Sequence, residues 1–201
     1  MASQSPALGP PGGPSLQKRE TSLPGVWVLQ PSIFRDPRGF FMETYHQAKL
    51  AGLGIAEPFV QDNHSYSRKG TLRGLHYQLR QPQAKLCRVI EGEALDVAVD
   101  IRVGSPHFGQ WTSVVLSADE GNQIYVPAGF AHGFLALTDK VQLLYKCSAF
   151  YDPADERGIA WNDPGLAIQW GIAEPLISER DAANPTLAAA PRESLPQFSG
   201  H

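Results

Sequence analysis

The sequence lacks a long apolar run, an excess of positive charge and all but two cysteines. No stretch approaches the roughly 18 continuous apolar residues of a membrane-spanning helix, so we predict no membrane span. The net charge of -3 offers no general attraction to nucleic acid or anionic lipid, and an anionic ligand therefore needs a local cluster of arginine and lysine. Cys87 and Cys147 lie in apolar, strand-like stretches. Two free, buried thiols in a cytoplasmic protein are the simplest interpretation, and one disulfide is the alternative.

The two ends of the chain lack the pattern of a folded segment. The first 20 residues are rich in proline, glycine and serine, and they have neither the basic start nor the apolar run of a signal peptide. We interpret residues 1–20 as a flexible tail and residues 184–201 as a loose C-terminal tail, in which residues 187–190 form at most a short helical turn. The prediction is one domain over residues 21–183, without internal repeats.

Short segments of alternating polarity, bounded by glycine, proline or aspartate, recur through this domain and are typical of antiparallel strands. Residues 46–52 are the best helical candidate. The stretch KLCRVIEGEALDVAVDIR, residues 85–102, predicts a hairpin in which alternate apolar residues from Leu95 to Ile101 share one face. Further strands are expected in GVWVLQP, WTSVVLS, NQIYVP, GFAHGFLAL and KVQLLYKCSAFY. Many short strands with little helix predict an all-β fold, a jelly-roll β-barrel with short peripheral helices, which can hold one ligand.

His76 lies in the strand-like stretch TLRGLHYQLR, residues 71–80. A histidine in such a segment is more often a core residue bonded to a backbone carbonyl than a catalytic base. The pattern alone therefore favours a structural role.

Seven stretches change this interpretation, because together they are similar to one family: DPRGFFMETYH, FVQDNHSYSRKGTLRGLHYQ, KLCRVIEGEALDVAVDIR, SPHFGQW, YVPAGFAHGF, LLYKCSAFYDP and GIAWNDPGLAIQW. In this order they resemble the dTDP-4-dehydrorhamnose 3,5-epimerases over nearly all of residues 25–182. The resemblance implies a cupin-type jelly roll and a homodimer. It also implies a reaction without metal or other cofactor, in which carbons 3 and 5 of the dTDP-4-keto-6-deoxy sugar dTDP-6-deoxy-D-xylo-4-hexulose are inverted in dTDP-L-rhamnose biosynthesis.

This reaction needs a base on one face of the sugar ring and an acid on the other. Both carbons flank the ketone at carbon 4, so their protons are removed through an enolate that a cation at the ketone oxygen stabilises. The resemblance implies that His76 is the base, Asp181 the carboxylate that orients it, Tyr145 the proton donor and Lys85 the cation. A neutral imidazole accepts a proton at cytoplasmic pH, and a carboxylate fixes its tautomer. Without the resemblance, Tyr145 would be a packing residue and Lys85 an exposed lysine at a strand end.

The nucleotide half of such a substrate needs cations for the pyrophosphate and an aromatic surface for thymine. Arg38 and Arg73 match the binding arginines of the family, and Tyr151 matches the aromatic residue that stacks on the base. Arg180 stands where the family carries lysine, which keeps the charge but changes the reach and geometry of the side chain. The remaining ligand positions that the resemblance implies are Glu43, Gln61, Asn63, His132 and Glu156.

The six histidines contain no H-x-H pair, although cupin-type barrels often bind a metal through two or three histidines and a carboxylate. We therefore predict no metal, and a site built from His64, His76 and His132 is the alternative.

Two other functions stay open at this stage. One is an epimerase that inverts only carbon 3 of a related dTDP-4-keto-6-deoxy sugar, since His76 and Tyr145 would serve both reactions. The other is a catalytically silent module that binds a sugar nucleotide, for which we would expect the loss of His76, Tyr145 or Asp181; all three are present.

Arg73 and His76 pose a geometrical problem. In a regular strand, side chains alternate between faces, so Arg73 and His76 would point in opposite directions. One hypothesis is a glycine bulge near Gly74 that redirects one side chain. The other is that Arg73 reaches a ligand held by a second subunit.

Overall fold

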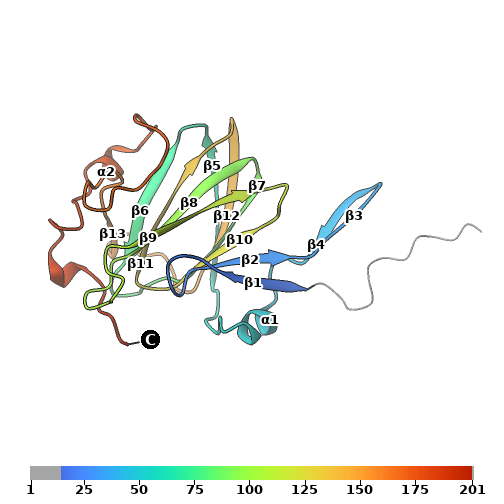
Figure 1. The fold of residues 1–201 in the computed structure, drawn as a ribbon, viewed down its shortest axis with the longest axis horizontal. Helices are drawn as coiled ribbons and strands as arrows, with labels where there is room; N and C mark the ends of the chain where they lie inside the picture. The colour runs from blue at the N-terminus through green and yellow to red at the C-terminus, as the bar shows by residue number, and fades with distance from the viewer. Residues whose placement is uncertain (1–14, 201) are drawn as a thin grey trace, which may run out of the picture.

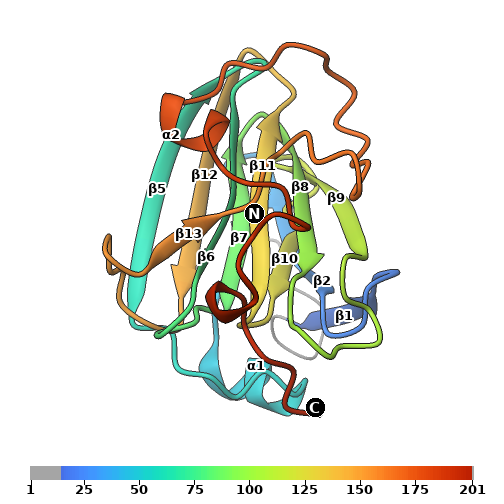
Figure 2. The ribbon, with the colours of Figure 1, turned by 90° about the vertical axis from the view of Figure 1, so that its left-hand side faces the viewer.

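The computed structural model describes residues 15–200, and its two main β-sheets face each other (Figure 1 and Figure 2). The six-stranded sheet contains, in spatial order, β1 (Leu16–Glu20), β2 (Trp27–Pro31), β10 (Gln123–Val126), β7 (Lys85–Glu91), β12 (Lys140–Cys147) and β5 (Gln61–Arg68). The five-stranded sheet contains β13 (Glu156–Gly158), β6 (Leu72–Gln78), β11 (Phe130–Ala136), β8 (Glu93–Asp100) and β9 (Trp111–Ser117). Strand pairs within both sheets are antiparallel, which confirms the predicted all-β class.

Strands that are consecutive in the sequence often lie in opposite sheets. The predicted hairpin over residues 85–102 is wrong, because β7 pairs with β10 and β12 whereas β8 pairs with β9 and β11. The chain crosses between the sheets at Gly92, whose φ of 78° suits glycine. A Cβ there would lie 2.0 Å from the carbonyl oxygen of Lys140, so the crossing requires glycine. Alternation in the sequence predicted both strands correctly but not their partners.

The strand β8 is buried on both faces, which explains its apolar character. Val97, Val99 and Ile101 are buried together as predicted, and Leu95 packs against the same cluster while partly exposed. The opposite face, with Ala94, contributes to the core between the two sheets. The barrel interior and the outer face of the five-stranded sheet are thus separate apolar clusters.

The predicted C-terminal tail, residues 184–201, is not loose over its described part. Leu187, Ala190 and Leu195 are buried in the cluster that covers the five-stranded sheet, and the tyrosine hydroxyl of Tyr77 donates to the carbonyl of Ser194 at 2.9 Å. A short 3-10 helix, η1 (Arg192–Ser194), lies within this segment. Apolar residues scattered among proline and serine give no periodic signal, so only the sheet that they cover reveals their role.

The N-terminal boundary also differs from the prediction. Residues 1–14 lie outside the described residues, but β1 pairs with β2 along its whole length, from Leu16 opposite Pro31 to Glu20 opposite Trp27. Because β1 is an edge strand with mostly exposed side chains, its sequence lacks the apolar alternation of a core strand. The ordered domain therefore begins before residue 21.

The remaining elements lie at the periphery. Helix α1 (Gln47–Gly52) confirms the predicted helix, and α2 (Glu179–Ala182) lies beside β6 at one end of the barrel (Figure 2). The hairpin of β3 (Ile33–Asp36) and β4 (Gly39–Met42) projects away from the two sheets (Figure 1). No helix among residues 15–200 is long and apolar enough to cross a membrane. Both cysteines are free and buried, as predicted.

Candidate active site

A cavity of about 830 Å³ opens between the two sheets and is lined by residues of both. The five-stranded sheet contributes residues of β6, β11 and β13, and the six-stranded sheet contributes residues of β5, β7 and β12. The segment that includes α2 closes one side. Ten of the thirteen residues predicted for the site line this cavity: Asn63, Arg73, His76, Lys85, His132, Tyr145, Tyr151, Glu156, Arg180 and Asp181.

His76 and Asp181 form a hydrogen-bonded pair in the cavity wall. The Nε2 atom of His76 lies 2.7 Å from Oδ1 of Asp181, and the side chains are 27% and 7% exposed. The backbone N–H of Gly74 donates to the other carboxylate oxygen at 3.1 Å. Burial acts to raise the pKa of Asp181, but the hydrogen bond and charge of His76, together with Gly74 and Ser178, outweigh it and hold the pKa below its usual value.

Strand β6 is irregular where the sequence predicted a bulge. Opposite β11, His76 pairs with His132 and Arg73 pairs with Phe134, so three steps along β6 match two along β11. Gly74 has a φ of 118° within this irregularity. The extra residue cancels the alternation, and Arg73 and His76 line the same cavity of one chain. The glycine-bulge hypothesis is confirmed, and a second subunit is not needed to explain the position of Arg73.

Only glycine fits at the bulge because the two strands approach closely there. A Cβ on Gly74 would lie 2.6 Å from the Cα of Gly133 and 2.8 Å from the carbonyl oxygen of His132. The same backbone therefore brings β6 against β11 and presents its N–H to Asp181. Local backbone geometry and the His76–Asp181 pair depend on one another.

Tyr145 and Lys85 reach the cavity from the six-stranded sheet, opposite the wall that carries His76. Burial raises the pKa of Tyr145 to about 12, with smaller contributions from Cys147, Cys87 and Glu156 that Arg73 opposes. The phenol consequently keeps its proton at neutral pH. The His76–Asp181 pair on one wall thus faces the protonated phenol of Tyr145 and the ammonium group of Lys85 on the other.

A third group of polar side chains lies at the mouth of the cavity. The Tyr151 hydroxyl donates to Glu156 at 2.8 Å, and Glu156 also forms an ion pair with Arg180. The Tyr151 side chain is nevertheless exposed, so its ring is accessible to a ligand. Gln61 does not line the cavity, but its side chain accepts from the Tyr151 N–H at 2.9 Å and donates to Asn63 at 3.0 Å, so it supports two residues that do.

Arg38 and Glu43 are not part of this cavity within one chain. Arg38 lies at the tip of the projecting β3–β4 hairpin and pairs with Asp36. Glu43 follows the hairpin and pairs with Lys49 at 2.6 Å. The sequence resemblance grouped these two residues with the site, whereas the fold of a single chain separates them from it.

Two supporting residues were not predicted from the sequence. Ser178 caps α2, and its hydroxyl accepts from the Asp181 N–H at 3.1 Å. The spacing S-x-x-D in SERD is an N-cap signal that would have found it. Asp96 lies 2.8 Å from Nε2 of His132; these residues are 36 positions apart and on different strands, so no local pattern links them.

A model of the dTDP-4-dehydrorhamnose 3,5-epimerase family matches residues 20–189 of the sequence. The chain belongs to this family. It is 50% identical over 171 residues to a dTDP-4-dehydrorhamnose 3,5-epimerase of Pseudomonas aeruginosa, which covers 84% of this chain and 94% of that protein. A relative of the same description from Neisseria gonorrhoeae is 48% identical over 177 residues, or 88% of this chain, but the match spans only 54% of that longer protein.

Solved structures of the epimerase family have the same fold. The dTDP-6-deoxy-D-glucose-3,5-epimerase of Legionella pneumophila, crystallised with dTDP-4-keto-L-rhamnose, has a TM-score of 0.90 and 44% identity, over 92% of this chain and all 100% of that one. A 3'-monoepimerase of Streptomyces bikiniensis, crystallised with dTDP-quinovose, has a TM-score of 0.82 and 40% identity, over 88% and 91% of the two chains. The predicted cupin-type jelly roll is confirmed.

Proposed function

We propose that this protein is a dTDP-4-dehydrorhamnose 3,5-epimerase that inverts carbons 3 and 5 of dTDP-6-deoxy-D-xylo-4-hexulose. The observation that carries the proposal is the placement of two proton-transfer groups on facing walls of one cavity. His76 with Asp181 lies on the five-stranded sheet, and Tyr145 lies on the six-stranded sheet. A sugar ring bound between them presents one face to each group, which is what inversion at carbon requires.

His76 acts as the base. Because Asp181 accepts the hydrogen bond at Nε2, Nδ1 is the ring nitrogen with a lone pair for the substrate proton. The Asp181 carboxylate then stabilises the imidazolium that forms. Such a positioned base contributes about 10²–10⁴-fold to the rate.

Tyr145 delivers a proton to the opposite face of the carbanion. Its pKa of about 12 keeps the phenol protonated until the enolate is present. The proton moves from the phenol oxygen to carbon, and the phenolate regains a proton from solvent. Lys85, on the same wall, supplies positive charge to the ketone oxygen, where the enolate charge develops.

The mouth of the cavity holds the nucleotide. Arg73 is fixed by the hydroxyl of Ser67 and the carbonyl of Tyr66, both at 3.1 Å, and its remaining N–H groups suit pyrophosphate oxygens. The exposed ring of Tyr151 provides a surface for thymine, while Glu156 holds its hydroxyl.

The active form in this proposal is a cytoplasmic homodimer. The β3–β4 hairpin exposes Phe40 and Phe41, at 59% and 62%, and carries Arg38 beyond the reach of its own cavity. Burial of these rings against a second copy would remove apolar surface from water and bring Arg38 and Glu43 toward a cavity. Phe41→Asp should yield monomers by analytical ultracentrifugation, whereas an unchanged dimer contradicts the role of the hairpin. The two free, buried cysteines are consistent with a reducing compartment.

The experiment that tests the proposal separates binding from turnover. His76→Asn should bind dTDP with the parental affinity in calorimetry and lose turnover of the 4-keto sugar by at least about 10²-fold. Turnover at the parental rate would refute the role of His76. Failure of the parent to turn over this sugar while it binds dTDP would instead favour a silent binding module.

Inversion of carbon 3 alone is the second candidate, and the similarity to the 3'-monoepimerase favours keeping it. The same base and acid serve both reactions, so the site residues do not distinguish them. The two reactions are distinguished by the carbons of the product that carry hydrogen taken up from solvent.

A further inference from the structure

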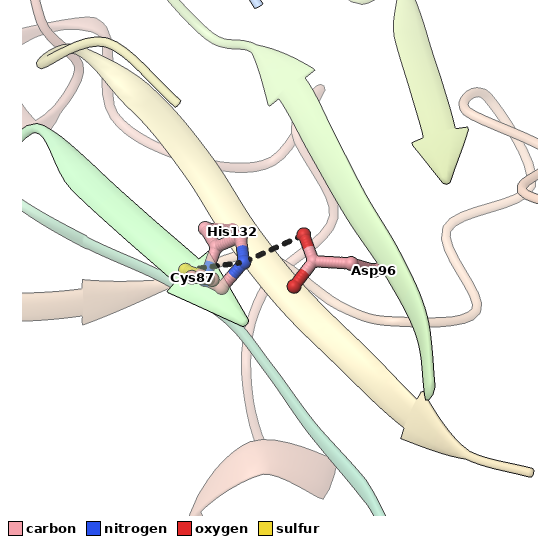
Figure 3. Close-up of side chains that lie close together, drawn as sticks. All are labelled: Cys87, Asp96 and His132. Atoms are coloured by element: carbon pink, nitrogen blue, oxygen red, sulfur yellow. Dashed lines mark hydrogen bonds and ion pairs between the residues drawn. The ribbon is translucent and has the colours of Figure 1, made fainter. Parts of the chain in front are cut away.

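A second cluster of titratable side chains lies deeper in the barrel than the His76–Asp181 pair. Cys87 on β7, Asp96 on β8 and His132 on β11 are buried and point toward one another from three strands (Figure 3). The Nε2 atom of His132 lies 2.8 Å from Oδ1 of Asp96 and 3.7 Å from Sγ of Cys87. One sulfur, one nitrogen and one oxygen atom, all within 4.8 Å of one another, thus converge from both sheets.

The cluster contains a polar atom that the protein leaves unsatisfied. Asp96 is 0% exposed, and its Oδ2 atom has no hydrogen-bond partner among residues 15–200. Buried carboxylate oxygens are normally paired, because the loss of hydration is costly. Asp96 therefore has an unused acceptor beside a thiol and an imidazole.

We propose that Cys87, Asp96 and His132 form a binding site for a thiophilic divalent cation such as zinc(II). Thiolate, imidazole and carboxylate are the donors that zinc prefers, and three protein ligands leave a fourth position open. Zinc–ligand distances of about 2.0–2.3 Å place tetrahedral ligand atoms about 3.3–3.7 Å apart. The nitrogen–sulfur separation of 3.7 Å lies at the upper end of this range. The nitrogen–oxygen separation of 2.8 Å is that of a hydrogen bond, which the cation would replace as these two atoms move apart.

The position of His132 connects this site with the cavity. His132 lines the cavity, whereas the buried Cys87 and Asp96 are not among the lining residues. A cation bound to all three therefore lies in the cavity wall, which provides both an entry path and access for a water or ligand atom to its fourth position.

Proton release accompanies this binding. Burial and the charge of Asp96 raise the pKa of the Cys87 thiol well above its usual value, while Lys85 opposes them and Cys147 adds to them. The neutral thiol avoids repulsion with Asp96 when no cation is bound. Because the thiolate is the form that binds a metal, binding of the cation would release the thiol proton.

The ligands are distant in the sequence, which is why the histidine pattern predicted no metal. His132 lies 36 residues from Asp96 and 45 residues from Cys87. The proposal does not rest on the epimerase activity, since it concerns binding that is measurable without substrate.

Titration of the full-length protein with cobalt(II) tests the site, because a cobalt–thiolate bond absorbs in the near ultraviolet. The parent should bind one cobalt(II) per chain with this absorption, and zinc(II) should displace it. Cys87→Ser should lose the absorption and bind roughly 100-fold or more weakly. The matched control Cys147→Ser, which changes the other buried cysteine, should behave like the parent.

Unfolding measurements keep the test decisive if Cys87→Ser is unstable. Zinc(II) should raise the thermal midpoint of the parent and of Cys147→Ser, but not that of Asp96→Asn. His76→Asn should retain the cobalt–thiolate absorption, because its pair with Asp181 is a separate group. Absence of stoichiometric absorption in the parent, or equal binding by Cys87→Ser, overturns the proposal.

Discussion

Replacement of Asp181 by asparagine should abolish most of the turnover without preventing folding. The carboxylate has two acceptor oxygens, one for His76 at 2.7 Å and one for the Gly74 N–H at 3.1 Å. Asparagine keeps the shape but has only one oxygen. The backbone N–H of Gly74 cannot rotate away, so the amide oxygen should turn toward it and the amide NH₂ toward His76.

This orientation imposes the wrong tautomer on His76. With an NH₂ group facing it, Nε2 must become the acceptor and Nδ1 must carry the proton. The nitrogen proposed to take the substrate proton can then no longer accept one. The substitution also removes the negative charge that stabilises the imidazolium. We expect kcat to fall about 10²–10⁴-fold, equivalent to about 3–5 kcal/mol of activation free energy.

Steady-state turnover of the 4-keto sugar, followed by NMR, measures the effect. Asp62→Asn is the matched control, because Asp62 is a 70% exposed carboxylate that pairs with Lys146 and does not line the cavity. It should leave kcat within a factor of about 2, since exposed ion pairs contribute little. A folded Asp181→Asn enzyme with kcat within threefold of the parent would refute the proposed tautomer control.

Three further predictions concern the acid, the bulge and the pH dependence of stability. Tyr145→Phe should lower kcat by about 10²–10⁴-fold with unchanged dTDP affinity, while NMR in D₂O still detects abstraction without inversion; loss of abstraction as well would contradict a donor role. Gly74→Ala should lower the free energy of unfolding, measured in urea, more than Gly39→Ala does. Both glycines have a positive φ, and the backbone strain alone costs about 1–3 kcal/mol, but only a Cβ at residue 74 clashes, at 2.6 Å from the Cα of Gly133. Equal losses of unfolding free energy in the two variants would refute the close approach. The pKa of Asp181 is lower in the folded state, so its carboxylate stabilises the fold above the unfolded pKa near 4 and this contribution disappears as the pH falls through the folded pKa. The unfolding free energies of the parent and Asp181→Asn should therefore converge below about pH 4, and a constant difference would contradict the pairing.

Alternating polarity predicted most strands of the barrel, because burial of one face leaves a period of two in the sequence. The period does not say which strand is the neighbour. The hairpin predicted over residues 85–102 fails for this reason, since Gly92 carries the chain to the opposite sheet. The sequence around Leu195 predicts a loose tail, because the burial of this residue depends on a sheet surface that no local pattern describes.

In the candidate site, too, the local sequence predicts local backbone geometry but not the contacts between residues that are distant in the sequence. The roles proposed for His76, Asp181 and Tyr145 came from the resemblance, since an isolated histidine or tyrosine in a strand carries no chemical signal. The glycine between Arg73 and His76 allowed a bulge to be predicted, because regular alternation contradicted the expected roles of both residues. The contact between Cys87 and His132 could not be predicted, because it depends on how the two sheets pack.

Reaction of dTDP-6-deoxy-D-xylo-4-hexulose in D₂O tests the central claim most directly. The product should be read by NMR for stereochemistry and for the carbons that carry deuterium. Abstraction by His76 and delivery from the facing wall at both positions predict dTDP-4-keto-L-rhamnose labelled at carbons 3 and 5. Label at carbon 3 alone, with carbon 5 uninverted, would contradict the double epimerisation.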